Sequence, residues 1–131
     1  MDNLPKIEMS FILTGKENYL SEITKALAIE PSRIKKKEEF RVAEYASFMW
    51  EFTTGKQHSK SVDFQSEELL KLFRGKEEVI VKLVNSYNLK PDLVVIIHAE
   101  IGDGPEINLS KEIIKFAAEI EAEIGFDVYF Y

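Results

Sequence analysis

Residues 93–101 read Leu-Val-Val-Ile-Ile-His-Ala-Glu-Ile, and their first five residues form the longest apolar run of the chain. A short apolar run rich in β-branched residues predicts a β-strand. Because both of its faces are apolar, we expect this strand to be central in a sheet and covered on both sides. The run is far shorter than the roughly 20 residues that a membrane-spanning helix needs, so we expect no membrane partner.

Alternating apolar residues predict further strands on both sides of this run, in residues 6–14, 45–54 and 127–131. In the first of them Ile7, Met9, Phe11 and Leu13 would share one face. The charged residues 33–41 predict either a short edge strand, which lysines would protect from aggregation, or a loop. Residues 55–61 have the composition of a polar surface loop.

Apolar residues at helical spacing predict four helices, in residues 18–30, 63–74, 76–87 and 110–124. Asn18, Asp63 and Ser110 are the expected N-caps because their side chains can accept a bond from a free backbone amide. Pro31 would end the first helix and Gly125 the last.

The order of these elements is β-α-β-β-α(α)-β-α-β. Its first six elements match the split β-α-β plan of ferredoxin-like folds, and the last helix and strand are additions. We therefore predict one α+β domain over residues 1–131, a two-layer sandwich with helices on one face of a mainly antiparallel sheet.

The composition excludes several classes of function. The 131 residues include no cysteine, so disulfides, thiol nucleophiles and cysteine metal sites are ruled out. A net charge of −6 argues against a nucleic-acid partner. Residues 1–5 have neither the basic start nor the apolar core of a signal peptide, and we expect a cytoplasmic protein.

No sequence motif of a known catalytic, phosphate-binding or metal site is present, so we assign no catalytic residue, metal ligand or cofactor. The side chains of His98 and Glu100 are two residues apart and would share a strand face. They could form a proton-transfer pair or part of a metal site. The alternative is a histidine at a strand end with a hydrogen-bonded partner.

The sheet face that the helices leave uncovered is the candidate binding surface. Polar and aromatic side chains there would form an amphipathic platform for a protein or a flat ligand. The alternative is that the chain itself, or a dimer of no functional meaning, covers this face. The candidate binding residues are Met49, Glu51, His98, Glu100, Asp127, Tyr129 and Tyr131.

Four short motifs resemble an uncharacterised bacterial family of domains of unknown function, DUF4279. They are Leu27-Ala28-Ile29-Glu30-Pro31, the aromatic strand around Trp50, Leu109-Ser110 and Asp127-Val128-Tyr129. The resemblance spans roughly residues 11–131. It departs at Ala28, where the family often has glycine, and in the lysine-rich segment after Pro31, which does not have the aromatic residue associated with the family there. The resemblance implies a bacterial, stand-alone α+β domain and transfers no catalytic residue.

Two hypotheses of function follow. The first is a non-enzymatic, cytoplasmic bacterial protein-interaction module, for example an inhibitor or immunity protein, that binds a protein partner or a second copy of itself. Its negative charge would steer it toward a basic target. The second is a small-molecule-binding domain or weak enzyme that uses His98 and Glu100, with Asp127 or Tyr129, around an apolar pocket.

Overall fold

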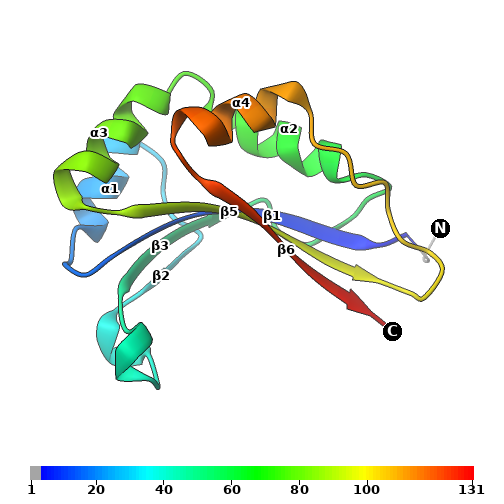
Figure 1. Cartoon of the computed structure of the whole chain (residues 1–131), viewed down its shortest axis with the longest axis horizontal. Coiled ribbons are helices and arrows are strands. Elements are labelled where there is room, and N and C mark those ends of the chain that lie inside the picture. The colour runs from blue at the N-terminus through cyan, green and yellow to red at the C-terminus, as the bar shows by residue number, and fades with distance from the viewer. Residues whose placement is uncertain (1–3) are drawn as a thin grey trace.

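The strand predicted from residues 93–101 is β5 (Lys90–Ala99), which lies between β1 (Lys6–Gly15) and β6 (Glu123–Phe130). The computed structural model describes residues 4–131. Residues 1–3, part of the segment in which we expect no signal peptide, lie outside the described residues. Strands β1, β5 and β6 run side by side through the middle of the molecule (Figure 1).

The described residues form one sheet of six strands, with five in the order β2-β3-β1-β5-β6 and β4 paired to β1. The remaining strands are β2 (Arg33–Lys35), β3 (Phe48–Thr53) and β4 (Gln57–His58). Every pair is antiparallel except β5–β6, which is parallel. The predicted α+β class with a mainly antiparallel sheet is therefore confirmed, while the ferredoxin-like assignment stays a prediction.

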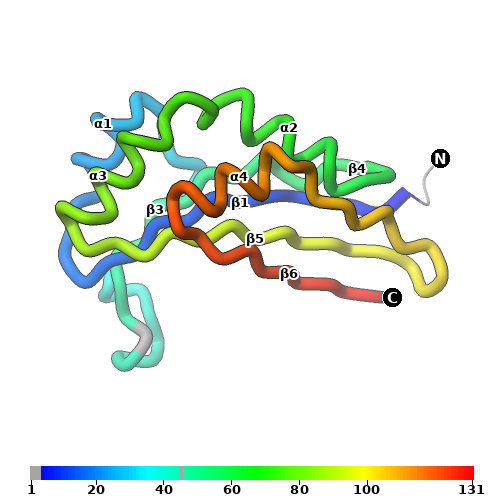
Figure 2. Tube along the Cα trace, turned by 45° about the horizontal axis from the view of Figure 1, so that its top comes forward, coloured from blue at the N-terminus to red at the C-terminus, as the bar shows by residue number. Residues whose placement is uncertain are grey.

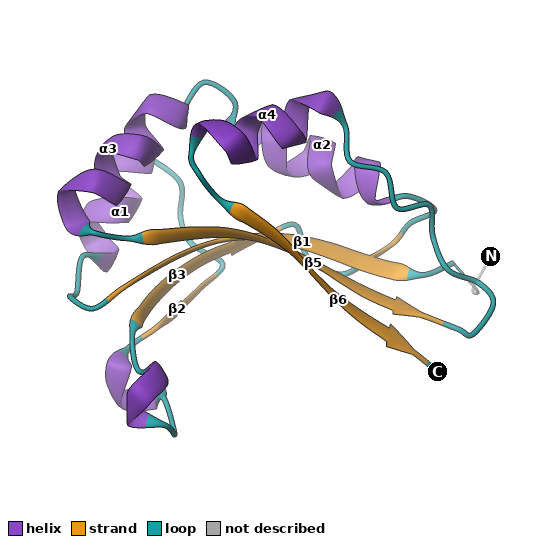
Figure 3. Cartoon of the chain, in the orientation of Figure 1, coloured by secondary structure: helices purple, strands orange, loops and turns teal. Residues whose placement is uncertain are grey.

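Four α-helices pack on one face of this sheet, as Figures 1 and 3 show. They are α1 (Leu20–Leu27), α2 (Val62–Phe73), α3 (Glu77–Tyr87) and α4 (Lys111–Glu119). The core between the two layers is centred on Phe11 of β1. Its ring lies 4.9 Å from that of Phe73 and 6.3 Å from those of Trp50 and Phe116, in edge-to-face geometries that favour aromatic packing.

The expectation that β5 is covered on both sides is wrong. Its burial alternates strictly: Leu93, Val95 and Ile97 are fully buried, whereas Val94 and Ile96 are only partly buried. The helices form a single layer, so only one face of β5 lies beneath them. A continuous apolar run does not by itself distinguish a strand covered on both faces from one in an open sheet.

Two helices end earlier than their sequence signals suggest. Helix α1 stops at Leu27, because Ala28 has φ +57° and its amide bonds to Thr24 O at 2.9 Å; Pro31 lies beyond this end. A left-handed residue at this position is typically glycine, the residue that the resembled family often has there. Helix α4 stops at Glu119, and Gly125 lies inside β6.

One of the three predicted N-caps is confirmed: Ser110 is the N-cap of α4, and its Oγ accepts a bond from Ile113 N at 3.3 Å. The N-cap of α1 is Tyr19 and not Asn18, although Asn18 Oδ1 accepts a bond from Leu20 N at 3.2 Å. Asp63 is not the cap of α2, because Ser61 Oγ accepts the bond from the Asp63 amide at 3.1 Å. The extended backbone of Ser61 positions its side chain for this contact.

Residues 33–47 contain the edge strand opposite β6 and two short turns. Each of the two alternatives for residues 33–41 holds for part of the segment: Arg33–Lys35 form the edge strand β2, and the remaining residues form a turn and loop. After β2 the chain forms two single turns, η1 (Lys37–Glu39) and η2 (Ala43–Tyr45), which project from the sheet on the side away from the helices (Figure 3). The predicted surface loop at 55–61 is partly wrong, because it contains β4, which pairs with the start of β1 (Figure 2).

Candidate binding surface

The side of the sheet away from the four helices is called the open face. Trp50 points into the core, so its neighbours Met49 and Glu51 lie on the open face. His98 is paired in register with Tyr129, and Asp127 and Tyr131 follow the same alternation on β6. The predicted binding residues of the strands therefore share one face, but their role in binding stays a prediction.

These residues do not form one cluster. Glu51 is bonded to Arg33, with Glu51 Oε1 2.9 Å from Arg33 Nε, and its side chain is only 12% exposed. Met49 is similarly buried. Both lie on β3, which β1 and β5 separate from β6. Glu51 thus joins β3 to β2 through an ion pair, and the exposed group consists of the residues on β5 and β6.

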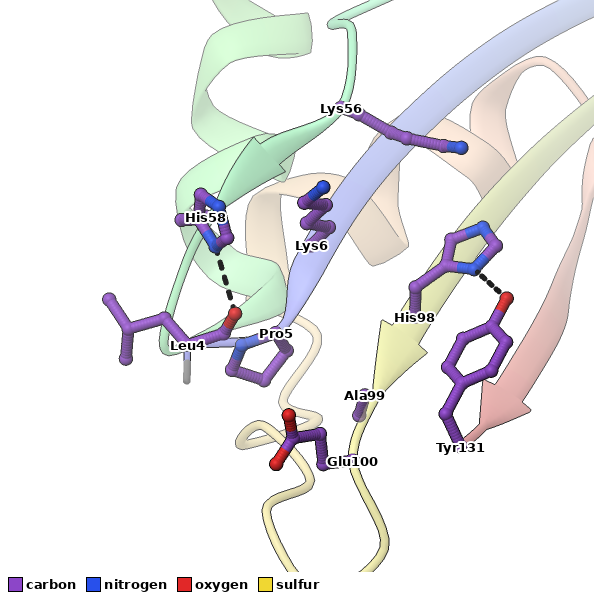
Figure 4. Close-up of a pocket in the computed structure, with 9 residues that line it drawn as sticks. All are labelled: Leu4, Pro5, Lys6, Lys56, His58, His98, Ala99, Glu100 and Tyr131. Atoms are coloured by element: carbon purple, nitrogen blue, oxygen red, sulfur yellow. Dashed lines mark hydrogen bonds between the residues drawn. The ribbon is translucent and has the colours of Figure 1, made fainter. Parts of the chain in front are cut away.

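His98 is held by two tyrosines. Its ring stacks on Tyr129 at 4.9 Å and 13°, and on Tyr131 at 5.9 Å and 10°. Its Nδ1 lies 2.9 Å from Tyr131 Oη. Figure 4 shows the Glu100 carboxylate turned toward Pro5 and away from the His98 ring. Among the described residues, the hydrogen-bond partner of His98 is Tyr131, as in the alternative of a histidine partnered at a strand end.

A cavity of about 370 Å³ opens beside His98 at the end of the sheet. It is lined by Leu4, Pro5, Lys6, Lys56, His58, His98, Ala99, Glu100 and Tyr131 (Figure 4). Strand pairing places His58, Lys6, His98 and Tyr129 opposite one another on four neighbouring strands. His58 Nδ1 lies 2.9 Å from the Leu4 carbonyl oxygen, which links β4 to the segment before β1.

Sequence reasoning missed Lys6, Lys56 and His58 as members of this site. The face of Lys6 could be deduced, because it alternates with Ile7 and Met9. The pairing of β4 with β1 could not, since a strand of two residues carries no periodicity.

The outer edge of β6 is a second distinctive feature. Tyr131 N donates to Ala99 O at 3.0 Å, and Tyr131 O accepts from Ile101 N at 3.1 Å. Successive residues of a strand point their backbone groups to opposite sides. Phe126, Val128 and Phe130 therefore direct their N–H and C=O groups away from β5, to an edge that has no strand partner within the described chain.

The side chains along this edge are also exposed. Phe126, Val128 and Phe130 are 41%, 40% and 56% exposed, although their register partners on β5 are buried beneath helices. Figure 1 shows β6 running away from α4 toward the C-terminus, which explains this exposure. The sequence pattern predicts this strand, but nothing local to it indicates that it lies at an edge.

One carboxyl group on the open face has a perturbed pKa. Partial burial of Asp92 raises its pKa above the usual value; Lys90, whose Nζ lies 3.9 Å from Asp92 Oδ2, partly opposes this, and Glu123 reinforces it. Asp92 lies near the start of β5 and His98 near its end, so Asp92 is not part of the cavity.

Within residues 4–131, no group of three or more His, Asp or Glu side chains could hold a metal ion. No helix in the described part of the chain is both long enough and apolar enough to cross a membrane.

Comparison with known proteins places the chain in a family. No curated protein and no solved structure matches it. The sequence model of one family, described as a domain of unknown function, matches residues 5–131. This match covers nearly the whole chain and confirms the resemblance inferred from the four short motifs. The chain belongs to the DUF4279 family.

Proposed function

We propose that this protein is a protein-interaction module that binds through the outer edge of β6. The observation that carries the proposal is an eight-residue strand whose outer edge has no strand partner within residues 4–131 and whose apolar side chains are exposed. Such an edge offers both backbone hydrogen bonds and apolar area to an added strand. An inhibitor or immunity role and a cytoplasmic location stay predictions.

The two edges of the sheet differ in a way that supports this proposal. Edge strands are commonly protected by being short or by carrying charges. Strand β2 has both protections, since it consists only of Arg33, Ile34 and Lys35. Strand β6 is long, and Asp127 is the one charged residue in its last six. An edge left open in this way is suited to pairing.

The occupant of the edge is a second copy of the chain. In an antiparallel pair centred on Val128, Phe126 of each copy would lie opposite Phe130 of the other. All three residues direct their backbone groups outward, so this register would form about six backbone hydrogen bonds. It also pairs aromatic side chains across the two strands, which is a favourable combination.

Charge helps to select this register. A pair centred one residue earlier would place Asp127 directly opposite Asp127 of the second copy, and like charges in that position are destabilising. The pair centred on Val128 instead places Asp127 opposite Tyr129. The resulting dimer would be symmetric and would leave neither β6 edge open.

The test is the oligomeric state measured by light scattering during gel filtration. We expect the wild-type chain to be dimeric at about 100 µM. Val128→Lys should be monomeric, because it places two ammonium groups face to face at the symmetry axis. Val42→Lys is the matched control, since Val42 is 49% exposed and lies far from β6 in the chain, and it should remain dimeric.

Charge rescue tests the register itself. An equimolar mixture of Val128→Lys and Val128→Glu should associate, whereas each variant alone should not, because opposite charges then face each other. A wild-type chain that stays monomeric at this concentration would overturn self-pairing. A Val128→Lys chain that dimerises as well as the wild type, or a mixture that fails to associate, would overturn this register.

A further inference from the structure

We infer that the cavity beside His98 binds a compact oxyanion, the phosphate or carboxylate group of a small molecule. The cavity is built from separate parts of the chain: the start of β1, the segment around β4, the end of β5 and the C-terminal residue. Its volume of about 370 Å³ is within the range of small-ligand sites.

Two lysines supply positive charge to this cavity. Lys6 comes from β1 and Lys56 from the turn before β4, and Figure 4 shows the Lys56 side chain extending across β1 toward the His98 ring. No ion pair joins either lysine to a carboxylate within residues 4–131. A lysine ammonium group without a protein counter-ion is available to an anion as a point charge.

His98 is oriented to donate a hydrogen bond to the same anion. In the tautomer in which Nδ1 accepts the bond from Tyr131 Oη, the ring proton is on Nε2. Nε2 is the nitrogen that Figure 4 shows on the Lys56 side of the ring. Stacking on Tyr129 and Tyr131 holds the ring in place, so the donor would be fixed before the ligand arrives.

The nearby carboxylates do not occupy this position. Glu100 lines the cavity, but its carboxylate turns away from His98 (Figure 4). Glu8 Oε2 accepts a bond from Thr53 Oγ1 at 2.9 Å. Asp127 is paired in register with Ile96, two residues before His98 along β5. The cavity therefore has two lysines and an oriented imidazole on one side, with the Glu100 carboxylate turned away from them, and this combination suits an oxyanion.

The test is a titration of the whole chain with inorganic phosphate at constant pH and ionic strength, followed by NMR. The chain has two histidines, so the ring signals of His58 and His98 can be assigned by single substitution. We expect a saturable shift of the His98 signal with phosphate and none with chloride. A parallel titration with acetate distinguishes a phosphate-group ligand from a carboxylate ligand, and saturation by either supports the proposal.

Paired variants provide the control. The double variant Lys6→Gln/Lys56→Gln should weaken anion binding by about tenfold or more. Lys111→Gln/Lys115→Gln changes the net charge equally on exposed residues of α4 and should bind like the wild type. A His98 shift that saturates with neither anion would overturn the proposal. So would an equal loss of anion affinity in both double variants, or an unchanged affinity in Lys6→Gln/Lys56→Gln.

Discussion

The hydrogen bond between Trp50 and Thr24 joins the sheet to α1, and its contribution can be measured. Trp50 is fully buried, and its Nε1 donates to Thr24 Oγ1 at 3.0 Å. Thr24→Val keeps the branched shape of the side chain and replaces the hydroxyl group, which also donates to the Leu20 carbonyl oxygen at 3.3 Å. The buried Nε1–H then has no acceptor, which typically costs about 1–3 kcal/mol. We expect a loss of about 2 kcal/mol in the free energy of unfolding.

A second substitution separates this bond from the rest of the packing. Trp50→Phe should cost about 3 kcal/mol, because it removes buried ring atoms and leaves a cavity. Phenylalanine has no N–H, so in that background Thr24→Val should lose only the longer bond from Thr24 Oγ1 to the Leu20 carbonyl oxygen, at 3.3 Å, and should cost much less. The coupling energy of the cycle should therefore be about 1.5–2 kcal/mol, which is within the range of contacting pairs.

The assay is urea unfolding followed by far-UV circular dichroism, since Trp50 is the single tryptophan of the chain and its fluorescence is lost in two of the variants. With a typical slope of about 2 kcal/mol per molar urea, the Thr24→Val midpoint should fall by about 1 M. Thr24→Ser retains the hydroxyl acceptor, so its urea midpoint should fall clearly less than that of Thr24→Val. Equal costs for Thr24→Val in the two backgrounds would refute the assigned role of this bond.

Two further predictions concern a carboxyl group and a glycine. Burial raises the pKa of Asp92, so the folded chain holds this proton more tightly than the unfolded chain, and stability is lost as the pH rises from the usual aspartate value through the raised one. Asp92→Asn should therefore be more stable than the wild type at neutral pH, a gain that disappears below the usual aspartate pKa, as urea midpoints across pH would show. Gly15→Ala should cost about 1–2 kcal/mol, because the new Cβ would lie 2.7 Å from Leu89 Cδ2. In Gly125→Ala the new Cβ would have no other atom within 4 Å, so this variant should be as stable as the wild type or slightly more stable by the same measurement.

The strands and helices could be predicted from sequence because their apolar residues repeat over long stretches. All four apolar residues predicted for one face of β1 are buried. The errors at the ends of α2 and α4 occur where two neighbouring residues could each give the same local signal. Ser61 and Asp63 are both good cap residues, and only the path of the chain selects the serine. Glu121 has φ +56° after α4, so Gly125 is not needed to end that helix.

The candidate site could be predicted only within each strand. Alternation correctly indicates that His98 shares a face with its even-numbered neighbours, and that Tyr129 and Tyr131 share one. It cannot show which strands are neighbours or how they are aligned. The contact of His98 with Tyr131 depends on the parallel register of β5 and β6. Register is a property of the assembled sheet and cannot be read from one strand. The sequence therefore suggests Glu100 as the partner of His98, whereas the structure shows Tyr131.

The C-terminal strand contributes to two surfaces, because successive side chains of a strand point to opposite faces of the sheet. Tyr129 and Tyr131 lie on the open face and hold His98 at the cavity. Phe126, Val128 and Phe130 point their side chains to the other face and their backbone groups to the outer edge. Pairing at the edge and anion binding at the cavity therefore use different atoms of one segment. A chain altered at Val128 should still bind phosphate, and a chain altered at Lys6 and Lys56 should still dimerise, so each proposal can fail without the other.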